Sequence, residues 1–188
     1  MEEKISGLVL GGVNFSENDK ILNIFTLEKG VVVGVKTAEC IPILLEAFNG
    51  DMEIVAVCAI HAGWRGTVSG IARNAVEALV DKGADPHRIR VAIGPSIGKC
   101  CFEVGDDVVD IVRQKLGNKY IDMFVIARSG AAYLDIKGIN MEIISECGVP
   151  LQNVDVSDEC TYCLSEKYYS HRRMKGVRGT MLSVITLN

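Results

Sequence analysis

The stretch EIVAVCAIHAGWRGTVSGIARNAVEALVDKGADPHRIRVAIG, residues 53–94, decides the fold class of this chain. Its opening run, 53–60, is apolar almost throughout, which predicts a strand buried on both faces. Apolar side chains then recur at helical spacing over 67–83, which predicts a helix that ends at Gly83. The apolar run 88–94 predicts the next strand.

The same alternation continues on both sides of this stretch. Strands are expected at 30–37, 132–136, 154–157 and 180–187, and helices at 105–116 and 137–148. The short apolar run 42–48 leaves its type open, and the first 28 residues carry the weakest signals. The pattern predicts an α+β or α/β-type layered sandwich, with mixed β-sheets covered by helices in a single domain, 1–188.

Composition narrows the function classes. The chain has 188 residues, 48% of them hydrophobic, so it can bury a sizeable core. Its net charge of −4 argues against nucleic acid as a partner, because that partner requires a basic face. No apolar run is long enough for a membrane span, and the start MEEKISG is unlike a signal peptide. We therefore expect a cytoplasmic protein with no membrane partner.

The segment HAGWRGT (61–67) follows the buried strand directly. His61 ends that strand, and a helix is expected to begin near Thr67. A helix N-terminus beside Arg65 would form a pocket for an anion such as phosphate. The alternative is a tight turn in which a carbonyl satisfies His61 and Trp64 joins the core.

The segment GPSIGKCCFEVG (94–105) also follows a strand. Cys100 and Cys101 lie beside Lys99, which could lower a thiol pKa and create a metal ligand or a nucleophile. The alternative is that both are small packing residues. Seven cysteines are an odd number, which argues against a disulfide framework, and Cys58 and Cys147 are expected to be buried apolar residues.

Two further motifs lie near the C-terminus. The CxxC at 160–163 is weak evidence for a metal, because no second pair has zinc-ribbon spacing, so a structural or pocket-lining role is favoured. The basic segment YYSHRRMKGVRG (168–179) would recognise phosphate through Arg172 and Arg173, or form a solvated turn.

The order of these motifs is more specific than any one of them. The motifs are TAEC-x-P (37–42), HAGWRGT (61–67), GPSIGKCCFEVG (94–105), YLDI (133–136), CT (160–161) and YSHRR (169–173) with a following RG (178–179). Together they resemble the laccase-domain family, also called polyphenol oxidase-like or YfiH-type proteins. The resemblance implies a compact α/β sandwich with a zinc ion in its pocket. It also implies phosphorolysis of adenosine, inosine, guanosine and S-methyl-5′-thioadenosine, with adenosine deamination as a side activity. An older description of such proteins is copper-dependent polyphenol oxidase.

The resemblance also implies roles for individual residues. His61 matches the family's first metal ligand, and either Cys100 or Cys101 matches its cysteine ligand. The family's third ligand is a later histidine, but no histidine lies between Cys101 and His171, so the third ligand stays open. The groups expected to act in catalysis or to bind the nucleoside and inorganic phosphate are His61, Cys100, Cys101, Arg65, Thr67, Cys40, Arg172 and Arg173.

Two other functions stay open at this point. A cysteine hydrolase could pair His61 with Cys100 or Cys101 without a metal. The chain could also be a catalytically degenerate binding module. Oxidase chemistry is least favoured, because copper oxidation needs several histidines per metal and the chain has three in total.

Overall fold

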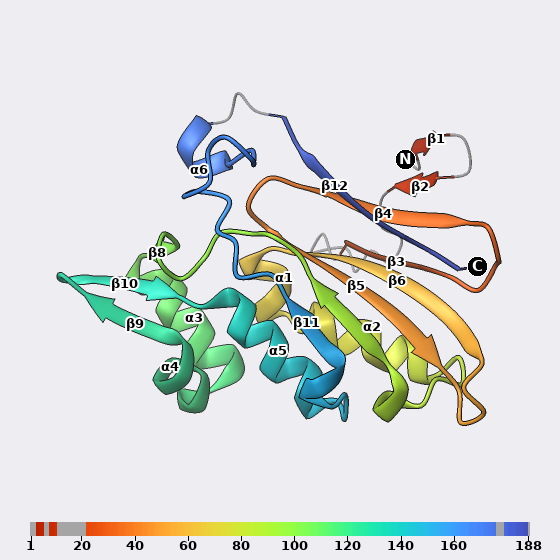
Figure 1. The fold of residues 1–188 in the computed structure, drawn as a ribbon. Coiled ribbons are helices and arrows are strands. Elements are labelled where there is room, and N and C mark those ends of the chain that lie inside the picture. Colours follow the sequence, from red (N-terminus) through yellow and green to blue (C-terminus); the bar gives the residue numbers. More distant parts are fainter. Residues whose placement is uncertain (1–2, 6–7, 11–21, 176–178, 188) are drawn as a thin grey trace.

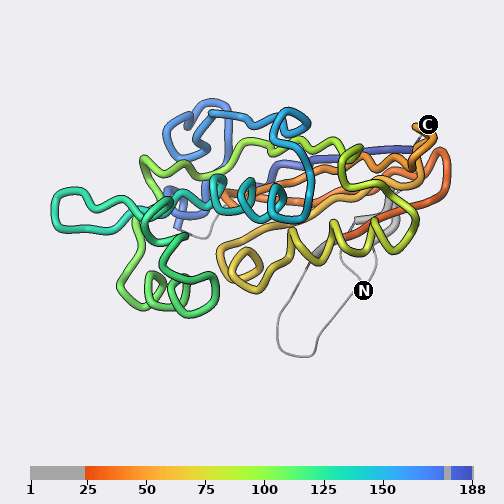
Figure 2. The backbone as a smooth tube through the Cα atoms, turned by 90° about the horizontal axis from the view of Figure 1, so that it is seen from below, coloured from red at the N-terminus to blue at the C-terminus, as the bar shows by residue number. Residues whose placement is uncertain are grey.

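The computed structural model describes residues 3–5, 8–10, 22–175 and 179–187. A five-stranded sheet lies in the middle of the molecule, with helices over one face and a four-stranded sheet over the other (Figure 1). A small three-stranded sheet lies at one end, and its β9–β10 hairpin extends away from the main body in both views (Figure 1, Figure 2). This arrangement confirms the prediction of mixed β-sheets covered by helices.

The middle sheet has the strand order β11-β7-β5-β6-β3. Only its edge strand β11 runs parallel to its neighbour, β7, while the other described neighbours are antiparallel. The strands of this sheet are β3 (Leu22–Thr26), β5 (Ile41–Phe48), β6 (Ile54–Ala62), β7 (Arg90–Ile93) and β11 (Val154–Val156).

Two smaller sheets complete the strands. The covering sheet has the order β1-β2-β4-β12 and consists of β1 (Glu3–Ile5), β2 (Leu8–Leu10), β4 (Val32–Thr37) and β12 (Met181–Thr186). The end sheet has the order β8-β10-β9 and consists of β8 (Glu103–Val104), β9 (Val125–Arg128) and β10 (Ala131–Leu134).

The helices are short, and none of those described is long and apolar enough to cross a bilayer. They are α1 (Trp64–Val68), α2 (Ile71–Val80), α3 (Asp106–Leu116), α4 (Asn118–Phe124), α5 (Ile136–Glu146) and α6 (His171–Met174). Single 3-10 turns occur at Pro86–Arg88 and Leu151–Asn153.

Strand β6 explains why the run 53–60 is apolar almost throughout. Ala56, Cys58 and Ile60 belong to the core beneath the helices. Val57 and Ala59 belong to the second core, between the middle and covering sheets. Successive side chains of a strand point to opposite faces, so a strand with a core on each face needs an apolar residue at every position.

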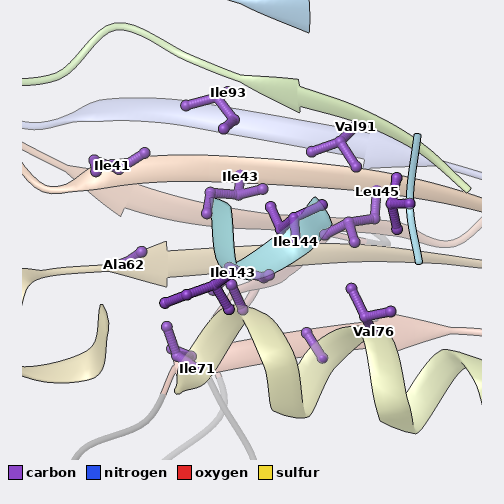
Figure 3. Packing of buried hydrophobic residues seen from close by; sticks show 14 of the residues in the cluster. Ile41, Ile43, Leu45, Ala62, Ile71, Val76, Val91, Ile93, Ile143 and Ile144 are labelled. Carbon is purple, nitrogen blue, oxygen red and sulfur yellow. The ribbon is translucent and has the colours of Figure 1, made fainter. Parts of the chain in front are cut away.

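The main core lies between the middle sheet and helices α2 and α5. Ile71 and Val76 from α2 and Ile143 from α5 pack toward the isoleucine and leucine side chains of β5 (Figure 3). Ile43, at the centre of β5, is fully buried and is paired in register with β6 on one side and β7 on the other. The open question about residues 42–48 is thereby answered, because this run is a strand.

The helix predicted at 67–83 differs from the observed one in both position and continuity. The first helix, α1, begins at Trp64, because the turn out of β6 is completed at Gly63, which has an extended conformation. It ends after one turn, because Gly70 has a left-handed φ of 79° that L-residues rarely adopt. The second helix, α2, then ends at Val80, before the turn at Gly83.

Replacing Ile43 with alanine tests the central position of β5. We expect the free energy of unfolding to fall by about 2–5 kcal/mol, because the site cannot fully collapse around the cavity. Urea denaturation measures this loss. Val184→Ala on β12, where the side chain is 45% exposed, is the control and should change stability by less than about 0.5 kcal/mol. Equal losses in the two variants would contradict the assignment of the core.

Candidate functional site

A cavity of about 560 Å³ lies where β4, β6, the loop after β7 and α6 meet. Its lining residues are Lys36, Ala38, Glu39, Cys40, Ile41, His61, Gly63, Trp64, Arg65, Ile97, Phe102, Ile136, His171, Arg172, Lys175 and Thr180. We call this cavity the His61 pocket. A larger groove of about 620 Å³ runs beside Leu44 and Arg90, but its described lining contains no histidine or cysteine.

His61 enters the pocket from the end of β6. It is held by strand pairing on both sides, opposite Leu22 in β3 and Pro42 in β5. Burial lowers the pKa of His61 below its usual value of 6.5, because the charged imidazolium loses hydration there. The imidazole is therefore mostly neutral at pH 7, with one nitrogen that donates a hydrogen bond and one that accepts.

Positive side chains gather around the same pocket. Arg65 and Arg172 line it together with Lys36 and Lys175, in a chain whose net charge is −4. The guanidinium of Arg65 lies 4.3 Å from the centre of the Trp64 ring. A concave surface with several cations attracts an anion such as phosphate.

Thr67 does not line the pocket. It lies inside α1 rather than at its start, it is fully buried, and its Oγ1 accepts a hydrogen bond of 2.9 Å from Nδ2 of Asn140. The expectations that a helix begins at Thr67 and that Thr67 contributes to the phosphate site are therefore wrong. Thr67 instead joins α1 to α5, because Asn140 also donates to the carbonyl of Ile136.

Glu39 is a pocket residue that was not among those expected from the sequence. Its backbone has a φ of 125°, an uncommon value for a residue with a side chain. Its carboxylate accepts a hydrogen bond of 2.9 Å from the backbone N–H of Arg172 and another from the hydroxyl of Ser170. The backbone N–H of His171 also donates to the carbonyl of Ala38, at 3.0 Å. Loop 38–40 thereby fixes the start of α6 at the pocket rim.

The two neighbouring arginines of α6 have different roles. Arg172 lines the pocket, donates to the carbonyls of Glu103 and Cys101 at 2.8 and 3.3 Å, and stacks over Phe102. Arg173 does not line the pocket, because its guanidinium donates to the carbonyls of Thr161, Tyr162 and Tyr168. Arg178, in the same basic segment, lies outside the described residues.

Four cysteines meet beside the pocket. The sulfur atoms of Cys100, Cys101, Cys160 and Cys163 all lie within 4.8 Å of one another. We call them the cysteine cluster. Cys100 and Cys101 thus lie beside the CxxC motif in space, although no second pair has zinc-ribbon spacing in the sequence. The cluster could hold a metal ion, and among the described residues no other group of three or more potential ligands is as close.

The cysteine cluster and His61 are neighbours but do not form one group. Phe102 and Ile97, from the loop that carries Cys100 and Cys101, line the His61 pocket, whereas the two cysteines do not. Cys40 is the cysteine that lines the pocket with His61. No described group of three or more metal ligands includes His61. The loop after β7 therefore reaches the His61 pocket through Ile97 and Phe102, but the expected convergence of its thiols with His61 on one cleft is not found, because Cys100 and Cys101 lie against Cys160 and Cys163.

The expected lowering of the thiol pKa by Lys99 is also wrong. Lys99 is paired with Asp135, 3.3 Å from its Oδ2 atom, and burial raises the pKa of both Cys100 and Cys101. Cys160 behaves differently. Burial alone would raise the pKa of the Cys160 thiol. Hydrogen bonds from backbone N–H groups, of which that of Gly98 has the largest effect, lower this pKa to about 7.

Comparison with known proteins extends this description. A family model described as multi-copper polyphenol oxidoreductase laccase matches residues 14–188. A protein named adenosine deaminase RL5, from an unknown prokaryotic organism, is 40% identical over 146 residues, which are 78% of this chain and 54% of that protein. A purine nucleoside phosphorylase YlmD of Geobacillus stearothermophilus is 37% identical over 163 residues, which are 86% of this chain and 58% of that protein. The chain thus spans little more than half the length of these relatives.

Solved structures agree with the sequence matches. The crystal structure of the hypothetical protein YfiH of Bacillus licheniformis is similar with a TM-score of 0.79 and 32% sequence identity. The match covers 88% of this chain and 61% of that one.

The lowered pKa of His61 predicts a pH dependence of stability. Between the folded pKa and 6.5, the unfolded chain binds a proton that the folded chain does not, so the free energy of unfolding falls as the pH is lowered through about 6.5. We expect His61→Gln to remove this part of the slope, as measured by urea denaturation from about pH 7.5 to about pH 5. The control is the same substitution at an exposed histidine outside the pocket, His87→Gln. A wild-type slope in His61→Gln would refute the assignment.

Proposed function

Because the chain belongs to the multi-copper polyphenol oxidoreductase laccase family, we propose that it is a purine nucleoside phosphorylase whose reaction takes place in the His61 pocket. The proposed substrates are inorganic phosphate together with adenosine, inosine, guanosine or S-methyl-5′-thioadenosine. The observation that carries the proposal is one cavity that combines an imidazole, several cations and aromatic rings.

The pocket suits a ligand with one apolar and one anionic part. Its volume of about 560 Å³ lies within the range usual for small-molecule sites. Trp64 and Phe102 offer ring faces to a purine base, and Arg65 and Arg172 offer charge to a phosphate. Because each arginine also stacks on one of these rings, the anion and the base would be held side by side.

The chemistry follows from that placement. Arg65 holds the phosphate so that a phosphate oxygen attacks C1′ of the ribose. The bond between C1′ and the base nitrogen breaks, and its electron pair goes to the base. The departing base takes a proton from His171 at the pocket rim, and neutral His61 orients the ribose by hydrogen bonding. The products are ribose 1-phosphate and the free purine. Positioning and charge stabilisation supply the rate enhancement.

The family name implies a metal, but the residues around His61 do not fit a three-ligand site. Cys100 and Cys101 are drawn into the cysteine cluster, and no described group of three ligands contains His61. No step of the proposed reaction therefore depends on a metal at His61. Deamination of adenosine is a proposed side activity of the same pocket, in which water attacks C6 of the base and ammonia leaves.

A cysteine hydrolase has less support. The hydrolase expected from sequence would use Cys100 or Cys101 as the nucleophile beside His61, but both lie outside the pocket lining and burial raises the pKa of both. A binding module without activity is tested directly by the first assay below.

The direct test is phosphate dependence. Incubation with inosine should yield hypoxanthine and ribose 1-phosphate only when inorganic phosphate is present, because phosphate is the nucleophile. Chromatography of the base and a coupled assay for the sugar phosphate measure both products. Release of free ribose instead would indicate a hydrolase, and absence of any product with all four nucleosides would indicate a binding module. Either result would end the proposal.

Arg65→Met tests the phosphate contact. Loss of one charge-assisted hydrogen bond costs about 1.5–3 kcal/mol, so we expect kcat/KM for phosphate to fall about 10- to 100-fold. The matched control is Arg113→Met, on the surface of α3, where the arginine pairs only with Asp110 among the ion pairs of the described residues. Equal kinetics for the two variants would show that phosphate does not bind beside Arg65.

A further inference from the structure

We propose that Cys100, Cys101, Cys160 and Cys163 bind a structural zinc ion as a tetrathiolate site that joins the loop after β7 to the loop after β11. This site is separate from the reacting atoms of the proposed function. It also differs from the metal site expected from sequence, which would have combined His61 with Cys100 or Cys101.

The first argument is the spacing of the sulfur atoms. Four ligands around zinc at Zn–S distances of about 2.3 Å form a tetrahedron whose sulfur atoms are about 3.8 Å apart. The Sγ atom of Cys163 lies 3.8 Å from that of Cys100 and 3.4 Å from that of Cys101. All four sulfur atoms lie within 4.8 Å of one another. The thiols are thus already near tetrahedral spacing, and none of the seven cysteines forms a disulfide.

The second argument is the backbone that holds the four thiols. β7 and β11 are parallel neighbours, so the loops that follow them leave the same edge of the middle sheet. The loops are joined further by a β-bridge between Ser96 and Cys160 and by a hydrogen bond of 3.0 Å from Thr161 N–H to the Ser96 carbonyl. The site is therefore assembled by the fold itself.

Hydrogen bonds to sulfur support the same conclusion. The backbone N–H of Gly98 donates to Sγ of Cys160 at 3.2 Å. The absence of a side chain at Gly98 lets this N–H approach the cluster. A Cβ there would be only 3.2 Å from Sγ of Cys100 and 3.5 Å from Sγ of Cys160. An N–H group aimed at sulfur stabilises a thiolate, which is the form that binds metal.

The third argument is charge. Zinc with four thiolates carries two net negative charges, and four cations surround the two loops. Each donates to backbone carbonyls of those loops: Arg128 to Cys100, Arg172 to Cys101, Arg173 to Thr161 and Tyr162, and Lys137 to Ser157 and Glu159. Lys137 is only 8% exposed, which is unusual for a lysine, and Asp135 and Asp158 are negative groups that already act on it. A tetrathiolate zinc site would add negative charge between these four cations, which would stabilise it.

The number and type of the ligands indicate which metal the cluster binds. Four thiolates at tetrahedral spacing are typical of zinc or iron, and closed four-cysteine sites without a position for water are typical of structural zinc. The CxxC spacing of Cys160 and Cys163 is the spacing usual in such sites. Because Cys100 and Cys163 are exposed, the metal can reach the cluster from solvent.

The site would also order one wall of the His61 pocket. Phe102 follows the ligand Cys101 directly and lines that pocket, and Arg172 holds both by donating to the Cys101 carbonyl and stacking on the Phe102 ring. Removing the zinc should therefore loosen the pocket wall as well as the two loops.

The test is zinc content of the purified full chain, measured by elemental mass spectrometry after dialysis. We expect about one zinc per chain for the wild type, as for other structural sites, and loss of zinc in both Cys163→Ser and Cys160→Ser. Cys163→His, which keeps a tetrahedral ligand, should retain zinc. Cobalt substitution should give the strong visible absorption of a tetrathiolate in the wild type and a changed spectrum in Cys163→His.

Two matched variants make the result decisive. Cys147→Ser changes a free cysteine outside the cluster, and His61→Gln changes the ligand of the competing site, so both should keep about one zinc per chain. Zinc that is lost in His61→Gln and retained in Cys163→Ser would overturn the proposal. Wild-type protein that binds neither zinc nor cobalt when its thiols are reduced would overturn it too.

Discussion

The structure depends on burying strand β6 on both faces. Its alternate side chains enter two different cores, one beneath α2 and α5 and one beneath the covering sheet. This double burial holds the strand rigidly, and His61 stands at its end, held between β3 and β5. The core therefore fixes the backbone position from which the imidazole extends into the pocket.

The other pocket residues come from less regular structure, and hydrogen bonds take the place of strand pairing. Glu39 accepts from the start of α6, and Arg172 reaches from α6 to the carbonyls of the loop after β7. Three segments far apart in sequence are thus tied together by charged groups at the pocket rim. The uncommon backbone of Glu39 belongs to this arrangement, since strained residues persist where surrounding contacts fix them.

The sequence predicted the elements with a clear period and missed those set by tertiary contacts. The buried strand at 53–60 and the helices near 105–116 and 137–148 are close to β6, α3 and α5. The break at Gly70 was missed because one glycine does not disturb the apolar period. The cysteine cluster was missed because its two pairs meet only through the parallel pairing of β7 with β11, which the sequence does not encode as a spacing. Thr67 was expected to begin a helix because the apolar helical spacing starts there, whereas the structure has a separate one-turn helix that begins at Trp64 and contains Thr67.

The distance along the chain between the two cysteine pairs has a consequence for biosynthesis. Cys101 and Cys163 are separated by 62 positions, and helices α3, α4 and α5 lie between them. A ribosome-bound chain that has only reached α5 holds the first pair without the second. A metal coordinated by both pairs would therefore bind late in synthesis, after β11 has been made. Its binding would link the loop after β7 to the loop after β11 when most of the chain has already been synthesised.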